Sequence, residues 1–273
     1  MTELAERRAV STWSLHRALG NEIAPNSAVG GGPCMQLPPI DGGKSLLDLL
    51  PDLATRNYRL LQICHFHLAS RERSYLETVR ARMSELGIEL EMLLIDAGDL
   101  MADDLDANLA WYHGWLDDAE ILGAQRARIC AGRSAPEHER LVASGKHLAA
   151  LAAAHPNVRV VTENWREATP DAASLLTVLD AAGESVGLLI DLANWSAPQK
   201  YEQLKLIADR AESCHAKCMF DVNGPNETDF RRTLGILKLV DYDGPISLIY
   251  DGPDNDEWTN LDQEWEIVRS VFD

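Results

Sequence analysis

Short, continuously apolar runs alternate along the chain with longer segments in which apolar residues recur every three or four positions. The short runs are typical of strands buried on both faces of a parallel sheet, and the longer segments have the spacing of helices with one buried face. The pattern predicts strands at residues 8–13, 58–65, 88–96, 126–132, 158–163, 186–191, 214–219 and 245–250. It predicts helices at residues 44–56, 71–87, 108–123, 136–155, 170–183, 201–211, 228–240 and 257–272.

This alternation predicts a parallel sheet, and at 273 residues it favours a closed (β/α)8 TIM barrel. No linker or change in composition divides the chain, so we expect a single domain over residues 1–273. An open doubly wound sheet fits less well, because its Gly-rich phosphate turn should directly follow the first strand. The Gly-rich segment at residues 30–33 lies too far beyond that strand and has no helix directly after it. We expect a loop there, with a lid or substrate clamp as the alternative.

Composition and charge restrict the classes of partner. The formal net charge is −18, and a surface of that sign repels nucleic acid and anionic membranes. Every apolar run is shorter than the roughly 18 residues of a membrane span, and the N-terminal segment lacks the apolar core of a signal peptide. We therefore expect a cytoplasmic protein that binds neither nucleic acid nor membranes. The sequence leaves homo-oligomerisation open.

The cysteines are five in number and scattered, at positions 34, 64, 130, 214 and 218. Cys214 and Cys218 would lie about 13 Å apart on one extended strand, which is too far for a disulfide. A cysteine-based zinc site needs closer pairs. We therefore expect buried free thiols.

Three consecutive predicted strands carry an ionisable residue near their C-terminal ends, namely Glu163, Asp191 and His215. In a TIM barrel the active site lies at this end of the strands. Because residues two apart on a strand share a face, Glu163 should point the same way as Val161, and Asp191 the same way as Leu189. If these faces point inward, the three side chains meet at one rim. Oxygen and nitrogen ligands of this kind suit a divalent ion such as Mn, Mg, Co or Zn.

Each of these residues also has a purely structural explanation. Glu163 could pair with an arginine at the rim, and Asp191 could cap the following helix. His215 could be a polar residue at a strand end. The occurrence of all three at equivalent positions on consecutive strands favours a common site.

Six short motifs follow one another in order along most of the chain. They are VSTWSLHR at residues 10–17, LQICHFHLAS at 61–70, ENW at 163–165, IDLAN at 190–194, HAK at 215–217 and YDGPISLIYDG at 242–252. In this order and spacing they resemble the sugar phosphate isomerase/epimerase family of the xylose isomerase-like TIM barrels. The resemblance covers about residues 10–272, and no single motif is specific on its own.

The resemblance implies one divalent metal, held by a Glu, an Asp, a His and a second Glu at the ends of strands five to eight. The first three fall on Glu163, Asp191 and His215, whereas Ile249 occupies the position of the second Glu. Epimerases of this family use both glutamates as acid and base, and isoleucine can neither bind metal nor move a proton. Asp251 lies about 6.6 Å further along the strand, so it would reach the ion only through a bend or a bridging water.

Further polar candidates lie at the same rim. Many relatives have a His where this chain has Asn194, which can bind a sugar hydroxyl but cannot share protons near neutral pH. Lys217 is a candidate catalytic residue that would meet a carbonyl, carboxylate or phosphate oxygen, with an ion pair to Glu163 or Asp191 as the alternative. His67 is a candidate base, because an ordinary histidine pKa near 6.5 suits that task. His65 could orient a substrate hydroxyl or be a packed histidine.

The remaining candidates are substrate contacts. Trp13, Trp165 and Trp195 follow or flank strand ends, where their flat faces suit the C–H faces of a sugar, although core packing explains each equally well. His16 and Arg17 in the first loop could contact an anionic end of the substrate.

Together these observations predict an isomerase or epimerase of a small sugar, sugar phosphate or related hydroxy-carbonyl compound, acting by proton transfer beside a divalent metal. The alternative is a metal-free or catalytically degenerate barrel that binds a sugar or sugar acid, because Ile249 replaces the usual Glu. The same group of barrels includes a DNA repair endonuclease with three metal ions. The charge of −18 and the single recognisable ligand set argue against that activity.

Overall fold

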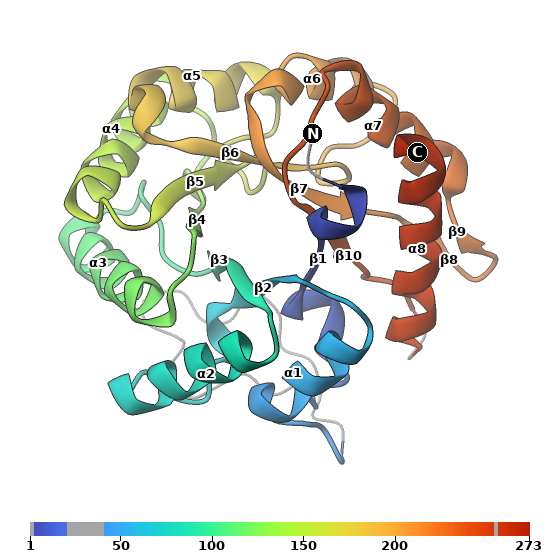
Figure 1. Cartoon of the computed structure of the whole chain (residues 1–273). Helices are drawn as coiled ribbons and strands as arrows, with labels where there is room; N and C mark the ends of the chain where they lie inside the picture. The colour runs from blue at the N-terminus through green and yellow to red at the C-terminus, as the bar shows by residue number, and fades with distance from the viewer. Residues whose placement is uncertain (1–2, 21–40, 254–255) are drawn as a thin grey trace.

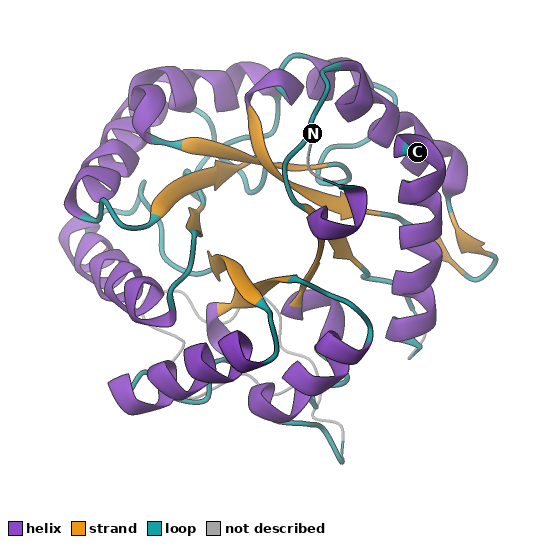
Figure 2. Cartoon of the chain, viewed as in Figure 1, coloured by secondary structure: helices purple, strands orange, loops and turns teal. Residues whose placement is uncertain are grey.

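A computed structural model of the chain describes residues 3–20, 41–253 and 256–273. Eight parallel strands form a closed barrel, and helices surround it (Figures 1 and 2), so the predicted TIM barrel is confirmed. Around the barrel the strand order is β1-β10-β7-β6-β5-β4-β3-β2. The barrel strands are β1 (Arg8–Ser11), β2 (Leu60–Cys64), β3 (Glu89–Ile95), β4 (Arg126–Ile129), β5 (Arg159–Glu163), β6 (Gly187–Asp191), β7 (Ala211–Lys217) and β10 (Ile246–Ile249).

A helix follows each barrel strand in the chain, as the apolar spacing predicted. Several helices begin at an aspartate whose side chain accepts a hydrogen bond from a backbone N–H of the first turn, as Asp104, Asp171 and Asp256 do. The helices are α1 (Leu46–Thr55), α2 (Arg73–Glu85), α3 (Leu105–Leu122), α4 (His138–Ala154), α5 (Ala172–Ala182), α6 (Lys200–Lys205), α7 (Glu227–Leu239) and α8 (Glu257–Phe272). The predicted bounds of the last helix, residues 257–272, agree with α8.

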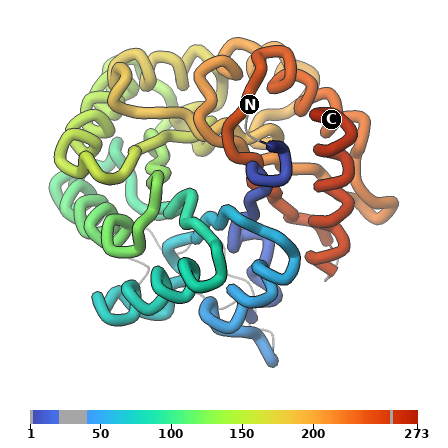
Figure 3. Tube along the Cα trace, in the orientation of Figure 1, coloured from blue at the N-terminus to red at the C-terminus, as the bar shows by residue number. Residues whose placement is uncertain are grey.

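The two ends of the described chain close the ring. Strand β1 pairs with β10, so the first and last parts of the chain lie side by side (Figure 3). The buried Arg7 guanidinium strengthens this closure, because it donates to the backbone oxygens of Gly244 and Tyr242, each at 2.9 Å.

The prediction around the seventh strand was wrong in its boundaries. The helix predicted at residues 201–211 ends at Lys205, and Ala211 already belongs to β7. A 3-10 turn at Ala208–Arg210 separates the two elements. A small hairpin of β8 (Phe220–Asp221) and β9 (Gly224–Pro225) then follows β7, and the apolar pattern gave no sign of strands this short.

The first strand ends at Ser11 rather than at Trp13 as predicted, and Thr12–Leu15 forms a 3-10 helix, η2, directly after it. The Gly-rich segment at residues 30–33 and Cys34 lie outside the described residues. The four described cysteines are buried free thiols, as predicted. Among the described residues, no helix is both long enough and apolar enough to cross a membrane.

Apolar side chains fill the space between barrel and helices, and a smaller cluster fills the barrel itself. Val161 and Leu189 belong to the inner cluster, together with Met92. Side chains alternate along a strand, so Glu163 and Asp191 also point inward, as predicted. The fold thus directs the polar ends of β5 and β6 toward the barrel axis.

Helices α4 and α5 lie side by side on the outside of the barrel (Figure 1), and a glycine allows their close contact. A Cβ atom at Gly145 would lie 2.3 Å from the Val178 carbonyl oxygen and 2.8 Å from Ala181 Cβ. We expect Gly145→Ala to lower the free energy of unfolding by about 1–3 kcal/mol, because the backbone must shift to admit the methyl group. Urea denaturation measures this change.

Gly235→Ala in α7 is the matched control. A Cβ atom there meets nothing within 4 Å, so the change should raise stability by up to about 1 kcal/mol through the better helix propensity of alanine. Equal effects of the two substitutions would contradict the account of α4 and α5.

Candidate active site

A cavity of about 220 Å³ opens at the C-terminal end of the barrel. Its walls include side chains from β5, β6, β7 and β10 and from the loops that follow them. Trp13 and Trp165, two of the candidate substrate contacts, are among the lining residues. The cavity therefore lies at the end of the barrel at which the sequence predicts the active site.

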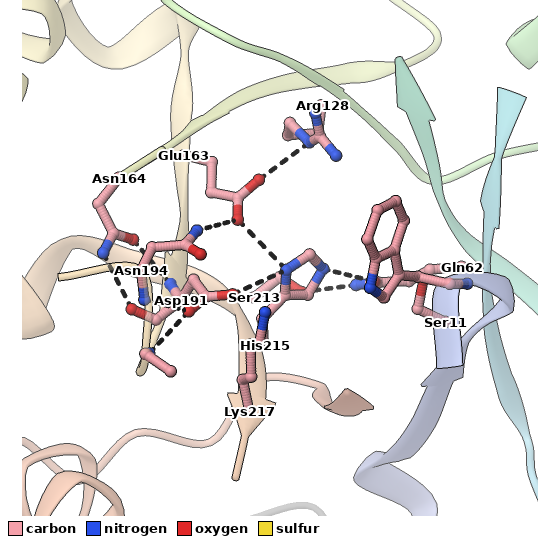
Figure 4. A network of polar contacts seen from close by, with 12 residues as sticks. Ser11, Gln62, Arg128, Glu163, Asn164, Asp191, Asn194, Ser213, His215 and Lys217 are labelled. Atoms are coloured by element: carbon pink, nitrogen blue, oxygen red, sulfur yellow. Dashed lines mark hydrogen bonds and ion pairs between the residues drawn. The ribbon is translucent and has the colours of Figure 1, made fainter. Parts of the chain in front are cut away.

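Glu163, Asp191 and His215 converge at this cavity (Figure 4). One ligand atom from each lies within 4.8 Å of the other two, and all three side chains are buried. The convergence follows from the parallel register, in which Asp191 lies beside His215, and Glu163 beside Leu189.

The imidazole of His215 lies between the two carboxylates and a glutamine. Its Nδ1 is 3.3 Å from Glu163 Oε1 and 3.5 Å from Asp191 Oδ2. Its Nε2 is 2.7 Å from the side-chain oxygen of Gln62, deeper in the barrel. The ring therefore presents Nδ1 to the carboxylates.

Asp191 is held by the start of the loop that follows β6. Its Oδ1 accepts hydrogen bonds from the backbone N–H groups of Ala193 and Asn194, at 2.7 and 2.8 Å. The Asn164 side chain bonds the backbone N–H and C=O of Asp191, at 2.7 and 2.9 Å. These contacts leave Asp191 Oδ2 facing His215.

Arg128 is a buried cation of the site that the sequence reasoning missed. Its Nε lies 3.1 Å from Glu163 Oε2, and its guanidinium also pairs with Asp96 and lies over the ring of Trp165. A signal was present, because Arg126 and Arg128 are two residues apart on one predicted strand and therefore share a face. A charged inward face is unusual for a barrel strand and marks a polar site.

Asn194 and Lys217 line the cavity, as predicted. Asn194 donates to Glu163 Oε1 at 2.9 Å. Lys217 pairs with Asp251 at 2.8 Å rather than with Glu163 or Asp191. Asp251 lines the cavity but does not belong to the three-residue ligand cluster. Ile249, the last residue of β10, lies beside Lys217 in the sheet and also lines the cavity.

The charges of the site shift the pKa values of its members. Burial alone would lower the pKa of His215, but the charges of Glu163 and Asp191 and hydrogen bonds to them outweigh it and raise that pKa to about 9. Burial likewise opposes ionisation of Asp191, yet His215 and Lys217 hold its pKa below the usual value. The pKa of Lys217 is raised, because Asp191 and Asp251 more than offset its burial.

Of the two candidate histidines after β2, His67 does not fit its predicted role, and His65 matches the alternative of a packed histidine. His67 Nδ1 lies 2.9 Å from Thr12 Oγ1, and burial lowers its pKa to about 3, so the expectation of a base near 6.5 was wrong. His65 packs edge-on against Trp111 and Trp115 of α3, with ring centroids 5.6 and 5.0 Å away. Neither histidine is among the residues that line the cavity. Both lie on the 3-10 helix η4 (His65–His67), which turns them off the strand face.

The first-loop candidates also lie apart from the cavity wall. The Nδ1 of His16 is 2.6 Å from the Trp13 carbonyl oxygen, and burial lowers the pKa of His16. Arg17 is paired with Glu257 and donates to the Gly252 carbonyl oxygen.

Trp195, the third candidate tryptophan, packs in the hydrophobic core. Its indole N–H donates a hydrogen bond to the Thr169 carbonyl oxygen.

The donor set fits one divalent cation. Glu163 Oε1, Asp191 Oδ2 and His215 Nδ1 face one another, and oxygen and imidazole ligands of this number leave coordination positions open for substrate and water. The Nε2–H of His215 is bonded on the far side of the ring, which is the usual arrangement for a metal-binding histidine.

Comparison with known proteins agrees with the barrel fold. A family model described as xylose isomerase-like TIM barrel matches residues 51–269. No curated protein gives a significant match.

Several solved structures share the fold at low sequence identity. A sugar phosphate isomerase/epimerase from Parabacteroides distasonis has a TM-score of 0.70 at 8% identity, covering 100% of this chain and 98% of that one. D-psicose 3-epimerase from Clostridium cellulolyticum, solved with D-tagatose, has 0.70 at 12%, covering 97% and 99%. A probable 3-DHS dehydratase from Bacillus anthracis has 0.66 at 12%, covering 96% and 98%. At these identities the likeness shows the fold alone.

The raised pKa of His215 predicts a pH-dependent stability of the metal-free protein. The imidazolium stabilises the fold fully below pH 6.5, and this contribution is lost as pH rises through about 9. In EDTA, the stability advantage of wild type over His215→Asn should therefore shrink between these pH values by something on the order of 3 kcal/mol. Urea denaturation at several pH values measures it, and an advantage that does not change with pH would contradict the assignment.

Proposed function

The chain belongs to the xylose isomerase-like TIM-barrel family, and from this premise we propose that it is a divalent-cation-dependent isomerase or epimerase. Its substrate is a small sugar, sugar phosphate or related hydroxy-carbonyl compound. The observation that carries the proposal is the meeting of Glu163, Asp191 and His215 at one cavity. Two structural neighbours, a sugar phosphate isomerase/epimerase and D-psicose 3-epimerase, support the reaction class.

In this proposal Glu163, Asp191 and His215 would hold the cation, and a bound cation would polarise the substrate carbonyl as a Lewis acid. Glu163 also acts as the base, taking a proton from the carbon next to the carbonyl. Arg128 contacts the second oxygen of Glu163 and so fixes the direction of its carboxylate. The Lys217 ammonium is placed to stabilise negative charge on a substrate oxygen.

Ile249 favours a reaction that needs a single base. Epimerisation by two bases requires a proton carrier on each face of the reacting carbon. In this cavity the β10 side contributes the apolar Ile249 and, above it, Asp251 already paired with Lys217. An aldose–ketose isomerisation needs one carboxylate, which removes a proton from one carbon and returns it to the neighbouring carbon, while the hydroxyl proton moves to the former carbonyl oxygen. That reaction matches the residues that line this cavity better than a two-base epimerisation does.

The second candidate is a metal-free sugar or sugar-acid binding barrel. Ile249 at the position of the fourth ligand favours it, as does the contact of Arg128 with a carboxylate that the cation would use. Thermal shift separates the two functions, because a ligand that binds only the folded state raises the melting temperature. Stabilisation by manganese supports the enzyme, and stabilisation by sugars without any response to manganese supports the binder.

Removal of the base should abolish proton exchange. With manganese present, we expect the wild type to incorporate solvent deuterium into one member of a panel of aldoses, ketoses and their phosphates. Glu163→Gln should reduce the rate at least about 100-fold, because an amide cannot accept the proton. Mass spectrometry measures the incorporation. Glu212→Gln, a carboxylate on β7 that pairs with Arg159, is the control, and an unchanged rate in Glu163→Gln would exclude it as the base.

Restoring the fourth ligand should tighten cation binding. Ile249→Glu adds a carboxylate to the cavity wall, so the dissociation constant for Mn²⁺ should fall at least about tenfold. Isothermal titration calorimetry measures it, with Ile249→Leu as a control that adds no ligand. Equal affinities of Ile249→Glu and wild type would show that position 249 does not face the cation.

A further inference from the structure

A line of buried polar side chains runs beneath His215 inside the barrel. Gln62 Oε1 contacts His215 Nε2 at 2.7 Å, and the amide nitrogen of Gln62 donates to Glu91 Oε2 at 2.6 Å. Glu91 Oε1 in turn lies 3.3 Å from the guanidinium of Arg126. Gln62 and Glu91 are fully buried, whereas Arg126 is about one-fifth exposed. A barrel interior of this kind is normally filled by branched apolar side chains.

A β-bulge places Glu91 in this line. Leu61 of β2 pairs with Leu90 of β3, but the next residue, Gln62, pairs with Met92. Glu91 is therefore the extra residue of the bulge. Bulges re-aim side chains and are common next to active sites. Since Met92 belongs to the inner apolar cluster, the bulge lets two successive residues face the barrel interior.

We propose that Glu91 and Gln62 are positioning residues that orient the ring of His215. They keep a hydrogen on Nε2, which points down into the barrel, and hold Nδ1 toward Glu163 and Asp191. The effect of this orientation on cation binding rests on the proposed function, whereas the hydrogen bond between Gln62 and His215 is independent of it.

The chemistry of the amide sets this orientation. A glutamine side chain has a donating end and an accepting end, and the carboxyl group of Glu91 accepts from the donating end. The accepting oxygen must then face His215, so the ring nitrogen that meets it carries a hydrogen. A reversed amide would bring its oxygen against a Glu91 oxygen, and no hydrogen bond joins an amide oxygen to an ionised carboxylate.

The neighbouring groups support the same arrangement. Ser213 Oγ lies 3.5 Å from the amide nitrogen of Gln62 and gives it a second acceptor. Arg126 holds the other oxygen of Glu91, so the carboxyl group cannot rotate without losing that contact. The hydrogen bonds between Arg126 and His215 therefore favour one orientation of the Gln62 amide.

The test compares two Gln–Glu pairs in the same barrel. Gln62→Leu removes the contact with His215 at nearly constant volume. Gln125→Leu removes a second pair, in which Gln125 donates to Glu89 at 2.6 Å on the exposed end of the barrel. In the swapped variant Gln62→Glu/Glu91→Gln, the new carboxylate at position 62 accepts from His215 and from the new amide at position 91, which restores the pattern.

Two measurements distinguish these variants, one of the Nε2–H hydrogen and one of the affinity for Mn²⁺. In metal-free protein, nitrogen-edited NMR should show a downfield, slowly exchanging Nε2–H resonance of His215 in wild type, the swapped variant and Gln125→Leu, and none in Gln62→Leu. Calorimetry should show Mn²⁺ binding weakened about 10- to 100-fold in Gln62→Leu alone. A Gln62→Leu protein that keeps the resonance and binds Mn²⁺ within about twofold of wild type would overturn the proposal.

Glu91→Gln keeps the shape of the core and serves if Gln62→Leu does not fold. It removes the fixed acceptor, so the resonance should broaden and Mn²⁺ binding should weaken severalfold; no change in either would overturn the proposal. The outcomes also separate this inference from the proposed function. A wild type that shows the resonance but binds no Mn²⁺ contradicts the function alone, and a wild type that binds Mn²⁺ regardless of Gln62 contradicts the positioning role alone.

Discussion

Two buried carboxylates on neighbouring strands determine most of what surrounds them. Glu163 and Asp191 are only 2% and 3% exposed, and a buried charge needs an opposite charge or hydrogen bonds beside it. In the structure His215 lies between the two carboxylates, Arg128 binds the outer oxygen of Glu163, and backbone N–H groups bind Asp191. A divalent cation bound between the same atoms would compensate the two negative charges more fully than the imidazolium does. The same arrangement would therefore suit both the metal-free fold and a metal site.

An apolar residue, Ile249, lines the cavity where the family resemblance implies a fourth acidic ligand, and this affects the charge of the cavity. Glu163, Asp191 and Asp251 are its acidic members together with Asp96, while Arg128 and Lys217 are permanent or nearly permanent cations. A divalent ion would bring these charges close to balance. Such a cavity tolerates an oxyanion on the substrate better than one with a further carboxylate, which is consistent with a reaction that develops negative charge on a carbonyl oxygen.

Much of the fold and part of the site could be predicted from the sequence, because both depend on periodic features. The alternation of apolar runs and helical spacing gives the barrel, and the register of parallel strands brings Glu163, Asp191 and His215 together. Other features depend on local geometry that leaves little trace in the pattern. The 3-10 helix at the end of β2 turns His65 and His67 away from the cavity wall, and the bulge at Glu91 turns a carboxylate inward. Arg128 could have been found, since its spacing from Arg126 already placed two arginines on one face.

The proposed activity depends most on cation binding by Glu163, Asp191 and His215, and anomalous diffraction from crystals soaked in millimolar manganese measures this binding directly. We predict one strong anomalous peak among Glu163 Oε1, Asp191 Oδ2 and His215 Nδ1, which disappears in Asp191→Asn. Wild-type crystals without a peak at that position would contradict the account.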